Sequence, residues 1–294
     1  MKFADLHGLE QFIKKNKVFA DYESIKEIEV GGASYNFCVQ TKNKRYFLKL
    51  LPDNGRFQKT KALCKMLKIL HPTKYEDFKQ YKMLIMSYFD GHKVYYDDCN
   101  PVFLTKLCLQ YQDLLNRRLD AQFIAPQFDM KQLCSKIDDL LQKRNGVIFR
   151  TLYKNLWNAI FSDIITLPKT KNIIHGDFTA NNLMITKDNA PIILDWEGIR
   201  YGYATEDWCC LIIELAGFRG FFGSCHRLRR LCNMINSQFH FSAKEWKYGF
   251  QMFYINLLLR RLNNDKKQSW RKQLCLYICL LGYFRVQKTV NNII

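Results

Sequence analysis

The spacing of apolar and polar residues changes after the first twenty positions and again near residue 100. Leu9, Phe12 and Ile13 are spaced as on one face of a short amphipathic helix. Residues 25–30, 35–40 and 45–51 then alternate as β-strands do, with turns at 31–34 and 41–44. The pattern predicts an antiparallel meander near the N-terminus.

The rest of the chain predicts an α+β protein. Residues 55–70 have helical spacing, and residues 83–89 form a buried strand that ends at the turn pair Asp90-Gly91. We place a lobe boundary there, with an N-terminal lobe at 1–89 and a C-terminal lobe at 90–294. Residues 104–115, 130–141 and 147–165 predict helices, and a buried helix is expected at 274–284.

Composition indicates a globular protein with anionic partners. The chain has 294 residues, of which 48% are hydrophobic, and a formal charge of +18. This charge attracts nucleotides, phosphorylated sugars, anionic membranes or nucleic acid, and does not choose among them. The eleven cysteines lie mostly in apolar runs, and neither a secretory signal nor a spanning segment is evident. We expect a cytosolic protein with reduced thiols.

One polar cluster carries the strongest chemical signal. His175, Asp177 and Asn182 lie within eight residues, and Asp195 follows after a predicted hairpin. The hairpin would bring Asn182 beside Asp195, and their oxygens suit Mg²⁺ that bridges the phosphates of a nucleotide. Asp177 is then placed to receive or orient the proton of an acceptor hydroxyl. Each residue alone could equally be a turn former or a helix cap.

A second candidate region lies in the predicted meander. Lys49 interrupts an apolar strand downstream of the glycine turn Gly31-Gly32, where glycines allow backbone amides to approach phosphate oxygens. Met86 and Tyr88 lie in the strand against which an adenine would pack. A snorkelling lysine and an ordinary core strand remain alternative interpretations.

The segments from His175 to Asn182 and from Asp195 to Glu197 resemble the aminoglycoside phosphotransferase and choline kinase families. The resemblance extends from about residue 25 to 217. It implies a bilobal protein-kinase-like fold, with a small antiparallel-sheet lobe, a larger mainly helical lobe, and ATP between them.

The resemblance also implies a role for each matching residue. Asp177 would be the catalytic base, while Asn182 and Asp195 would hold magnesium. The remaining roles are Lys49 at the nucleotide phosphates, Gly31 and Gly32 in the loop above them, His175 as a brace of the catalytic loop, and Asp207 as its support.

Departures from the kinase pattern point to a small-molecule or glycan acceptor. Glycine at 176, where protein kinases usually have arginine, and Asp195-Trp196-Glu197 in place of Asp-Phe-Gly both favour a small-molecule kinase. The family pairs its strand lysine with a helix glutamate, yet no acid lies between Asn54 and Tyr75. Lys49 therefore pairs elsewhere, for example with Asp53 or Asp195, or the enzyme is slow or inactive.

The acceptor class is inferred from charge. Residues 227–272 contain eleven Lys and Arg against two acids. This balance disfavours a polycationic aminoglycoside and favours an anionic sugar, such as a lipopolysaccharide core residue presented at the inner face of the membrane. A solvated basic surface and an aromatic cage for choline built from Trp208, Trp246 and Trp270 are alternatives. A pseudokinase that docks an anionic partner is the alternative class, and no nucleic-acid recognition motif is present.

Overall fold

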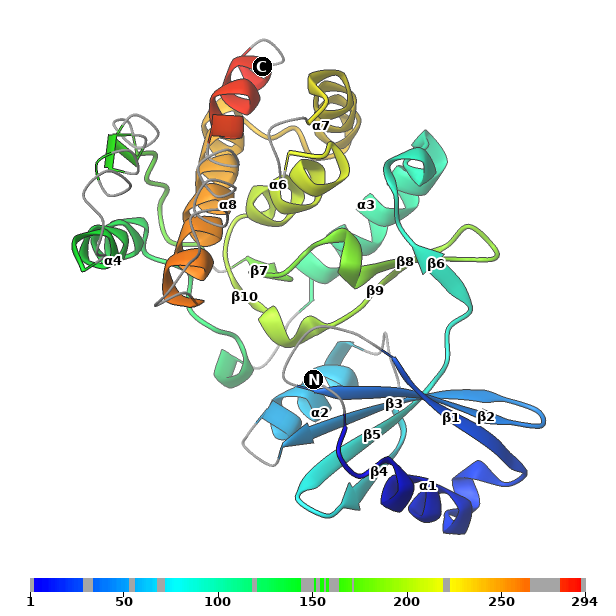
Figure 1. Cartoon of the computed structure of the whole chain (residues 1–294). Coiled ribbons are helices and arrows are strands. Elements are labelled where there is room, and N and C mark those ends of the chain that lie inside the picture. Colours follow the sequence, from blue (N-terminus) through cyan, green and yellow to red (C-terminus); the bar gives the residue numbers. More distant parts are fainter. Residues whose placement is uncertain are drawn as a thin grey trace. The chain divides into compact units, whose positions relative to one another are not determined.

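The computed structural model divides the chain into two compact units, Met1–Asp90 and Gly91–Ile294. It describes residues 3–28, 34–52, 56–67, 72–117, 121–143, 151, 154–155, 157–158, 164–170, 172–218, 223–264 and 281–291. Figure 1 shows the helices and strands of both units.

The first unit is built on a five-stranded antiparallel sheet. The strands are β1 (Tyr22–Ile28), β2 (Tyr35–Thr41), β3 (Arg45–Pro52), β4 (Pro72–Phe78) and β5 (Tyr81–Ser87), in the order β1-β2-β3-β5-β4. The register Gln40↔Arg45 closes the hairpin between β2 and β3. The predicted meander is confirmed, whereas its glycine turn at Gly31-Gly32 lies outside the described residues. Strand β4 was not predicted.

The two faces of this sheet pack against different helices (Figure 1). Helix α1 (Leu6–Lys15) begins where Asp5 accepts a hydrogen bond from the Gly8 amide, and it buries Leu9 and Ile13 on one face. The opposite face carries Leu51, Leu84 and Met86, against which Phe57 of helix α2 packs. Helix α2 (Arg56–Leu67) confirms the helix predicted at 55–70.

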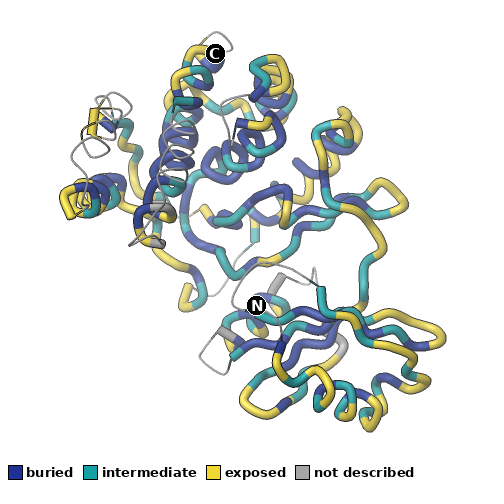
Figure 2. Tube along the Cα trace, in the orientation of Figure 1, coloured by how far each residue is buried: buried dark blue, intermediate teal, exposed yellow. Residues whose placement is uncertain are grey.

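The second unit is mainly helical. Its helices are α3 (Pro101–Leu115), α4 (Met130–Gln142), α6 (Ala204–Leu215), α7 (Cys225–Phe239) and α8 (Ala243–Asn264). Asn100, Asp129 and Ser224 cap the N-termini of α3, α4 and α7. Helix α6 packs against α8, and both are largely buried (Figure 2). Residues 281–290 are helical, while most of the helices predicted at 147–165 and 274–284 lies outside the described residues.

Short strands position the polar cluster within this unit. Strands β6 (Gly91–Lys93), β8 (Leu183–Thr186) and β9 (Pro191–Ile193) form one small sheet, and β7 (Ile173–Ile174) pairs with β10 (Arg200–Tyr201). The connections between these strands carry the candidate site.

The burial of tryptophan and cysteine side chains bears on two statements made from the sequence, the aromatic cage and the reduced thiols. Trp208 and Trp246 are buried in the core, so they do not form an exposed aromatic cage, and Trp270 lies outside the described residues. Cys108, Cys209 and Cys232 are buried free thiols. Within the described ranges, the helices are all too short or too polar to cross a membrane.

Candidate active site

The hairpin from β8 to β9 joins the two predicted metal ligands. Leu183 pairs with Ile193, and the Leu194 amide donates a hydrogen bond of 2.8 Å to the backbone oxygen of Asn182. Asn182 directly precedes β8, and Asp195 lies two residues after β9, at the same end of the hairpin. The predicted hairpin is confirmed.

Asn182 also contacts the proposed base. Its Nδ2 donates hydrogen bonds of 2.8 Å to the Asp177 backbone oxygen and 3.1 Å to Asp177 Oδ2. Because the Nδ2 of Asn182 donates to Asp177, the Oδ1 of Asn182 takes no part in these two hydrogen bonds. Asp195 adopts a left-handed backbone conformation, with φ 56°, which aspartate tolerates better than most residues.

His175 connects the loop to the hairpin. Its side chain is fully buried, its Nδ1 accepts a 3.3 Å hydrogen bond from the Asp177 amide, and its Nε2 lies 2.7 Å from the Leu194 carbonyl oxygen. Since a carbonyl only accepts, Nε2 carries the proton and the ring is in a single neutral tautomer. Trp196 packs against the ring with 4.7 Å between centroids. One imidazole thus fixes the backbone beside Asp177 and beside Asp195.

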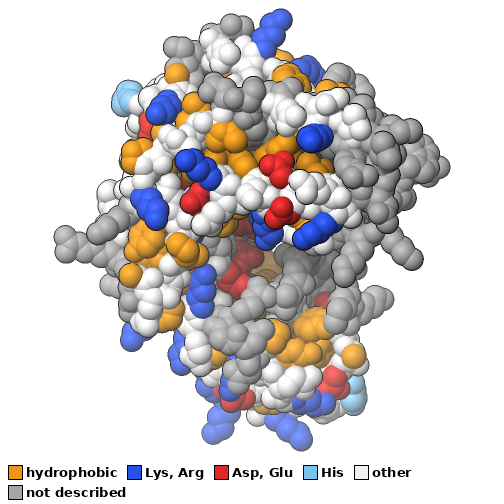
Figure 3. Space-filling view, turned by 90° about the vertical axis from the view of Figure 1, so that its left-hand side faces the viewer, with side chains coloured by type: hydrophobic (Ala, Val, Ile, Leu, Met, Phe, Trp, Pro, Cys, Tyr) orange, Lys and Arg blue, Asp and Glu red, His pale blue; other side chains and the backbone are white. Residues whose placement is uncertain are grey.

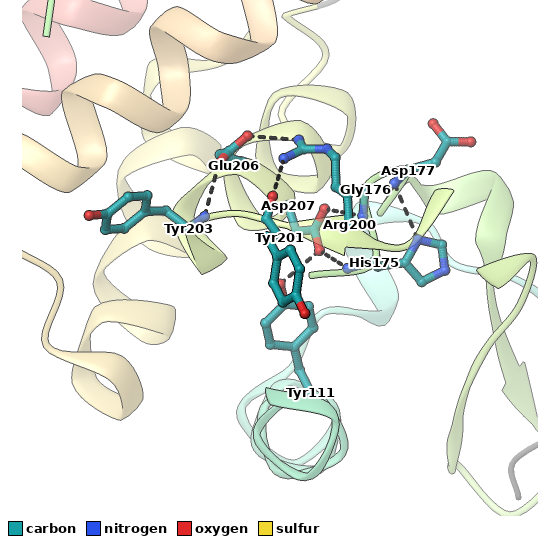
Figure 4. Close-up of polar contacts among 9 residues, drawn as sticks. All are labelled: Tyr111, His175, Gly176, Asp177, Arg200, Tyr201, Tyr203, Glu206 and Asp207. Carbon is teal, nitrogen blue, oxygen red and sulfur yellow. Dashed lines mark hydrogen bonds and ion pairs between the residues drawn. The ribbon is translucent and has the colours of Figure 1, made fainter. Parts of the chain in front are cut away.

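Asp207 supports the same loop from helix α6. Its Oδ2 accepts hydrogen bonds from the His175 amide at 2.6 Å and the Tyr111 hydroxyl at 2.7 Å, and its Oδ1 accepts one from the Gly176 amide at 2.9 Å. Figure 4 shows this carboxylate under the loop, with the Asp177 side chain pointing away from it. Burial raises the pKa of Asp207, and the hydrogen bonds that its carboxylate accepts from Tyr111 and from the Gly176 amide oppose the rise.

Gly176 is required by the path of the backbone. Its φ is +78°, and a Cβ at this position would lie 2.1 Å from the carbonyl oxygen of Gly198. A residue with a side chain would meet both a strained conformation and a backbone clash. The glycine between His175 and Asp177 therefore has a structural cause.

A buried ion pair lies next to Asp207. Arg200, which pairs with Ile174 across β10 and β7, donates a 2.7 Å hydrogen bond to Glu206. Glu206 also accepts a 2.9 Å hydrogen bond from the Tyr203 amide (Figure 4). Burial raises the pKa of Glu206, and Arg200 opposes the rise. The pair ties β10 to the start of α6, and β10 in turn pairs with β7, the strand before the loop.

Two further contacts were not anticipated from the sequence. Arg260 of α8 places Nη2 3.3 Å from Asp177 Oδ1, and Glu214 of α6 accepts a 2.9 Å hydrogen bond from the Ala180 amide. Both partners are more than thirty residues from the loop, and local periodicity carries no signal for such pairs. The excess of basic residues in 227–272 was the only hint of Arg260.

In the first unit, Lys49 shares a row of the sheet with Asn36 of β2, Leu84 of β5 and Tyr75 of β4. Asn36 is buried, and its Oδ1 has no hydrogen-bond partner in the part of the chain that the structure describes. Helix α2 contains no carboxylate over its length, Arg56–Leu67. Asp53, one of the partners considered for Lys49, lies outside the described residues.

The other residues predicted to contact the nucleotide lie in and after β5. Met86 pairs with Phe47 and packs in the apolar cluster on the α2 face. The Tyr88 amide donates a 3.1 Å hydrogen bond to the Arg45 carbonyl oxygen, and the Arg45 guanidinium lies 4.8 Å from the Tyr88 ring. Gly31 and Gly32 lie outside the described residues.

Comparison with known proteins assigns the chain to a family. A sequence model of the phosphotransferase enzyme family matches residues 24–222, and the chain belongs to this family. No curated protein sequence matches the chain at a significant level. The match to the family model confirms the prediction of a phosphotransferase. It also confirms the resemblance to the family of aminoglycoside phosphotransferases and choline kinases.

Solved structures with the same fold include three of different specificity. A choline kinase, LicA from Streptococcus pneumoniae, has a TM-score of 0.63 at 17% identity over 97% of this chain and 99% of that one. A GDP complex of aminoglycoside 2'-phosphotransferase-IIIa has a TM-score of 0.69 at 11% identity, over 99% and 100%. An ethanolamine kinase of Plasmodium vivax has a TM-score of 0.61 at 14% identity, over 92% and 84%. The predicted bilobal kinase-like fold is confirmed, and these identities carry the fold alone.

Proposed function

We propose that this protein is an ATP- and Mg²⁺-dependent kinase that phosphorylates a hydroxyl group of a small molecule or glycan. The observation that carries the proposal is the hydrogen-bonded chain from Asp177 through Asn182 to Leu194, the residue before Asp195. It supports a carboxylate base next to Asn182, with Asp195 following the partner strand, which is the set of side chains that a phosphoryl-transfer site uses.

Asp177 is the base in this proposal. It accepts the proton of the acceptor hydroxyl as that oxygen attacks the γ-phosphorus of ATP. The bond from the γ-phosphorus to the bridging oxygen breaks, and ADP leaves with its electron pair. The contacts of His175 and Asn182 with Asp177 hold the base in one orientation, which lowers the barrier through positioning.

Asn182 and Asp195 are the proposed metal ligands. An amide oxygen and a carboxylate are hard donors, and Mg²⁺ at nucleotide sites typically takes one or two protein ligands besides phosphate and water, so the donor set fits. When bound, Mg²⁺ neutralises charge on the phosphate oxygens. Lys49 would contact the same phosphates, with Gly31 and Gly32 in the loop above them and Met86 and Tyr88 against the base. We propose residues 1–89 as the nucleotide-binding lobe and residues 90–294 as the catalytic and acceptor-binding lobe.

For the acceptor, we propose an anionic sugar rather than choline, ethanolamine or an aminoglycoside. The supporting observation is the charge of residues 227–272, which contain eleven basic residues against two acids. A polycationic acceptor would be repelled by this segment. An acidic glycan, such as a lipopolysaccharide core residue at an anionic membrane surface, would be attracted.

The test is phosphoryl transfer from labelled ATP to a metabolite and glycan extract, followed by mass spectrometry. We expect label in a hydroxyl-bearing product with the wild type and none with Asp177→Asn. The matched control is Asp188→Asn, because Asp188 is an exposed carboxylate in the hairpin turn. Tight nucleotide binding without transfer to any acceptor would contradict the proposal and favour a pseudokinase.

A further inference from the structure

Helix α8 carries a polar stripe on an otherwise buried segment. Residues 251–255, 258, 259 and 262 are buried, whereas Asn256, Arg260 and Asn263 are not. These three positions follow the spacing i, i+4, i+7 and therefore lie on one face of the helix. Arg260 is the residue of this stripe that contacts Asp177.

The two carboxylate oxygens of Asp177 have different neighbours. Oδ2 accepts a hydrogen bond from Asn182, and Oδ1 lies 3.3 Å from Arg260 Nη2. An acceptor hydroxyl that reaches Asp177 therefore arrives beside the Arg260 guanidinium. The side chain of Arg260 is 67% exposed, so the ion pair with Asp177 is weak and its other donors remain accessible.

The position of Arg260 beside Asp177 carries information that the total charge of the protein does not. On the face shown in Figure 3, lysine and arginine side chains are scattered among carboxylates rather than gathered in one patch. Total charge attracts anions to the whole surface and selects no position on it. The guanidinium of Arg260, in contrast, lies beside Asp177, so it attracts an anionic group to the place where the reacting hydroxyl must lie.

We propose that Arg260 binds an acidic group of the acceptor, a carboxylate or a phosphate, and so determines specificity for acceptors that carry an acid close to the reacting hydroxyl. The proposal rests on the kinase function proposed above. A planar guanidinium binds either group through paired hydrogen bonds while it remains next to Asp177. The acid and the hydroxyl then belong to one residue of the acceptor or to two adjacent ones.

The experiment separates potential acceptors by charge before phosphorylation, because every product is more anionic than its precursor. A metabolite and glycan extract is divided by ion exchange into cationic, neutral and anionic fractions. Each fraction is incubated with the enzyme, Mg²⁺ and γ-labelled ATP. One half of the anionic fraction is first treated with a phosphatase, which is then removed, to distinguish phosphate monoesters from carboxylates.

We expect label in the anionic fraction. Arg260→Gln should lower kcat/KM for the labelled acceptor, purified from that fraction, by about 10-fold or more, mainly through KM, because a hydrogen bond to a charged group is lost. Arg260→Lys should recover part of this loss. Lys244→Gln is the matched control, since Lys244 is an exposed cation on the same helix and sixteen residues away, about 24 Å along the axis.

Each contrary outcome has a distinct meaning. Label in the neutral or cationic fraction alone would overturn the specificity proposal and leave the kinase function intact. Equal losses for Arg260→Gln and Lys244→Gln would overturn it as well. If Arg260 only oriented Asp177, Arg260→Gln would slow phosphoryl transfer to the anionic acceptor and ATP hydrolysis, in which water is the acceptor, by the same factor. That result would overturn the role of Arg260 in acceptor specificity. Absence of label from every fraction would contradict the kinase function itself.

Discussion

The support that Asp207 gives to the catalytic loop predicts a large effect for Asp207→Asn. Asparagine preserves the shape but has one acceptor oxygen, whereas donors face both carboxylate oxygens, from His175 and Tyr111 at Oδ2 and from Gly176 at Oδ1. One donor must then face an NH₂ group. The lost charged hydrogen bond costs about 1.5–3 kcal/mol, and a donor left without a partner costs about 1–3 kcal/mol. Burial disfavours the charged form of Asp207 and raises its pKa. Replacing the buried carboxylate with a neutral amide therefore offsets part of this loss of stability.

We therefore expect a net loss of about 2 kcal/mol in the free energy of unfolding, measured by urea denaturation, and a Tm lower by about 4–8 °C. Because Gly176 precedes Asp177, displacement of the loop should also lower kcat by about 100-fold. The control is Tyr111→Phe, which removes one donor and retains both backbone hydrogen bonds, and should cost about 1 kcal/mol with little loss of kcat. Wild-type stability and rate in Asp207→Asn, or equal damage by the two variants, would refute the reasoning.

Two further predictions concern the backbone and the buried ion pair. Gly176→Ala should destabilise the protein more than Gly217→Ala in urea denaturation. Both glycines have positive φ, which costs an alanine about 1–2 kcal/mol. Among the described residues, a Cβ at Gly176 would also lie 2.1 Å from the backbone oxygen of Gly198, whereas a Cβ at Gly217 would have its nearest contact at 3.7 Å, with the Gly223 Cα. Equal costs would contradict the clash. Burial raises the pKa of Glu206 above its ordinary 4.5, so the folded state keeps this proton to higher pH than the unfolded chain. The stability contributed by protonation is present below pH 4.5 and is lost as pH rises through the folded pKa. The free energy of unfolding of wild type relative to Glu206→Gln should therefore fall as pH rises from 4 to 7, and parallel curves would contradict this.

Local pattern was sufficient for the elements that hold the proposed ligands. Strands β8 and β9 are joined by a short polar turn, and Pro191 stands at a strand start, where its missing N–H is tolerated. Once the hairpin is predicted, the proximity of Asn182 and Asp195 follows from its register. The α1 helix and the strands β1, β2 and β3 were predicted for the same reason, because each is encoded within a few consecutive residues.

Features that depend on distant residues were not predictable in this way. Strand β4 contains Lys74, Glu76 and Asp77 at the edge of its sheet, and charges that protect an edge strand also obscure its alternation. The contact of Arg260 with Asp177 spans 83 positions, and no periodicity links them. The hydrogen bonds of Asp207 to the loop span 31 and 32 positions, and only the family resemblance indicates this residue.

The most direct test of the account compares wild type with Asp177→Asn in two measurements on the same preparations. The first is Mg²⁺-dependent transfer of the γ-phosphoryl group of ATP to an acceptor hydroxyl, and the second is nucleotide affinity by calorimetry. If Asp177 is the base, transfer falls by at least about 100-fold while nucleotide affinity changes little. Transfer that persists in Asp177→Asn at the wild-type rate would contradict the assignment of the catalytic site.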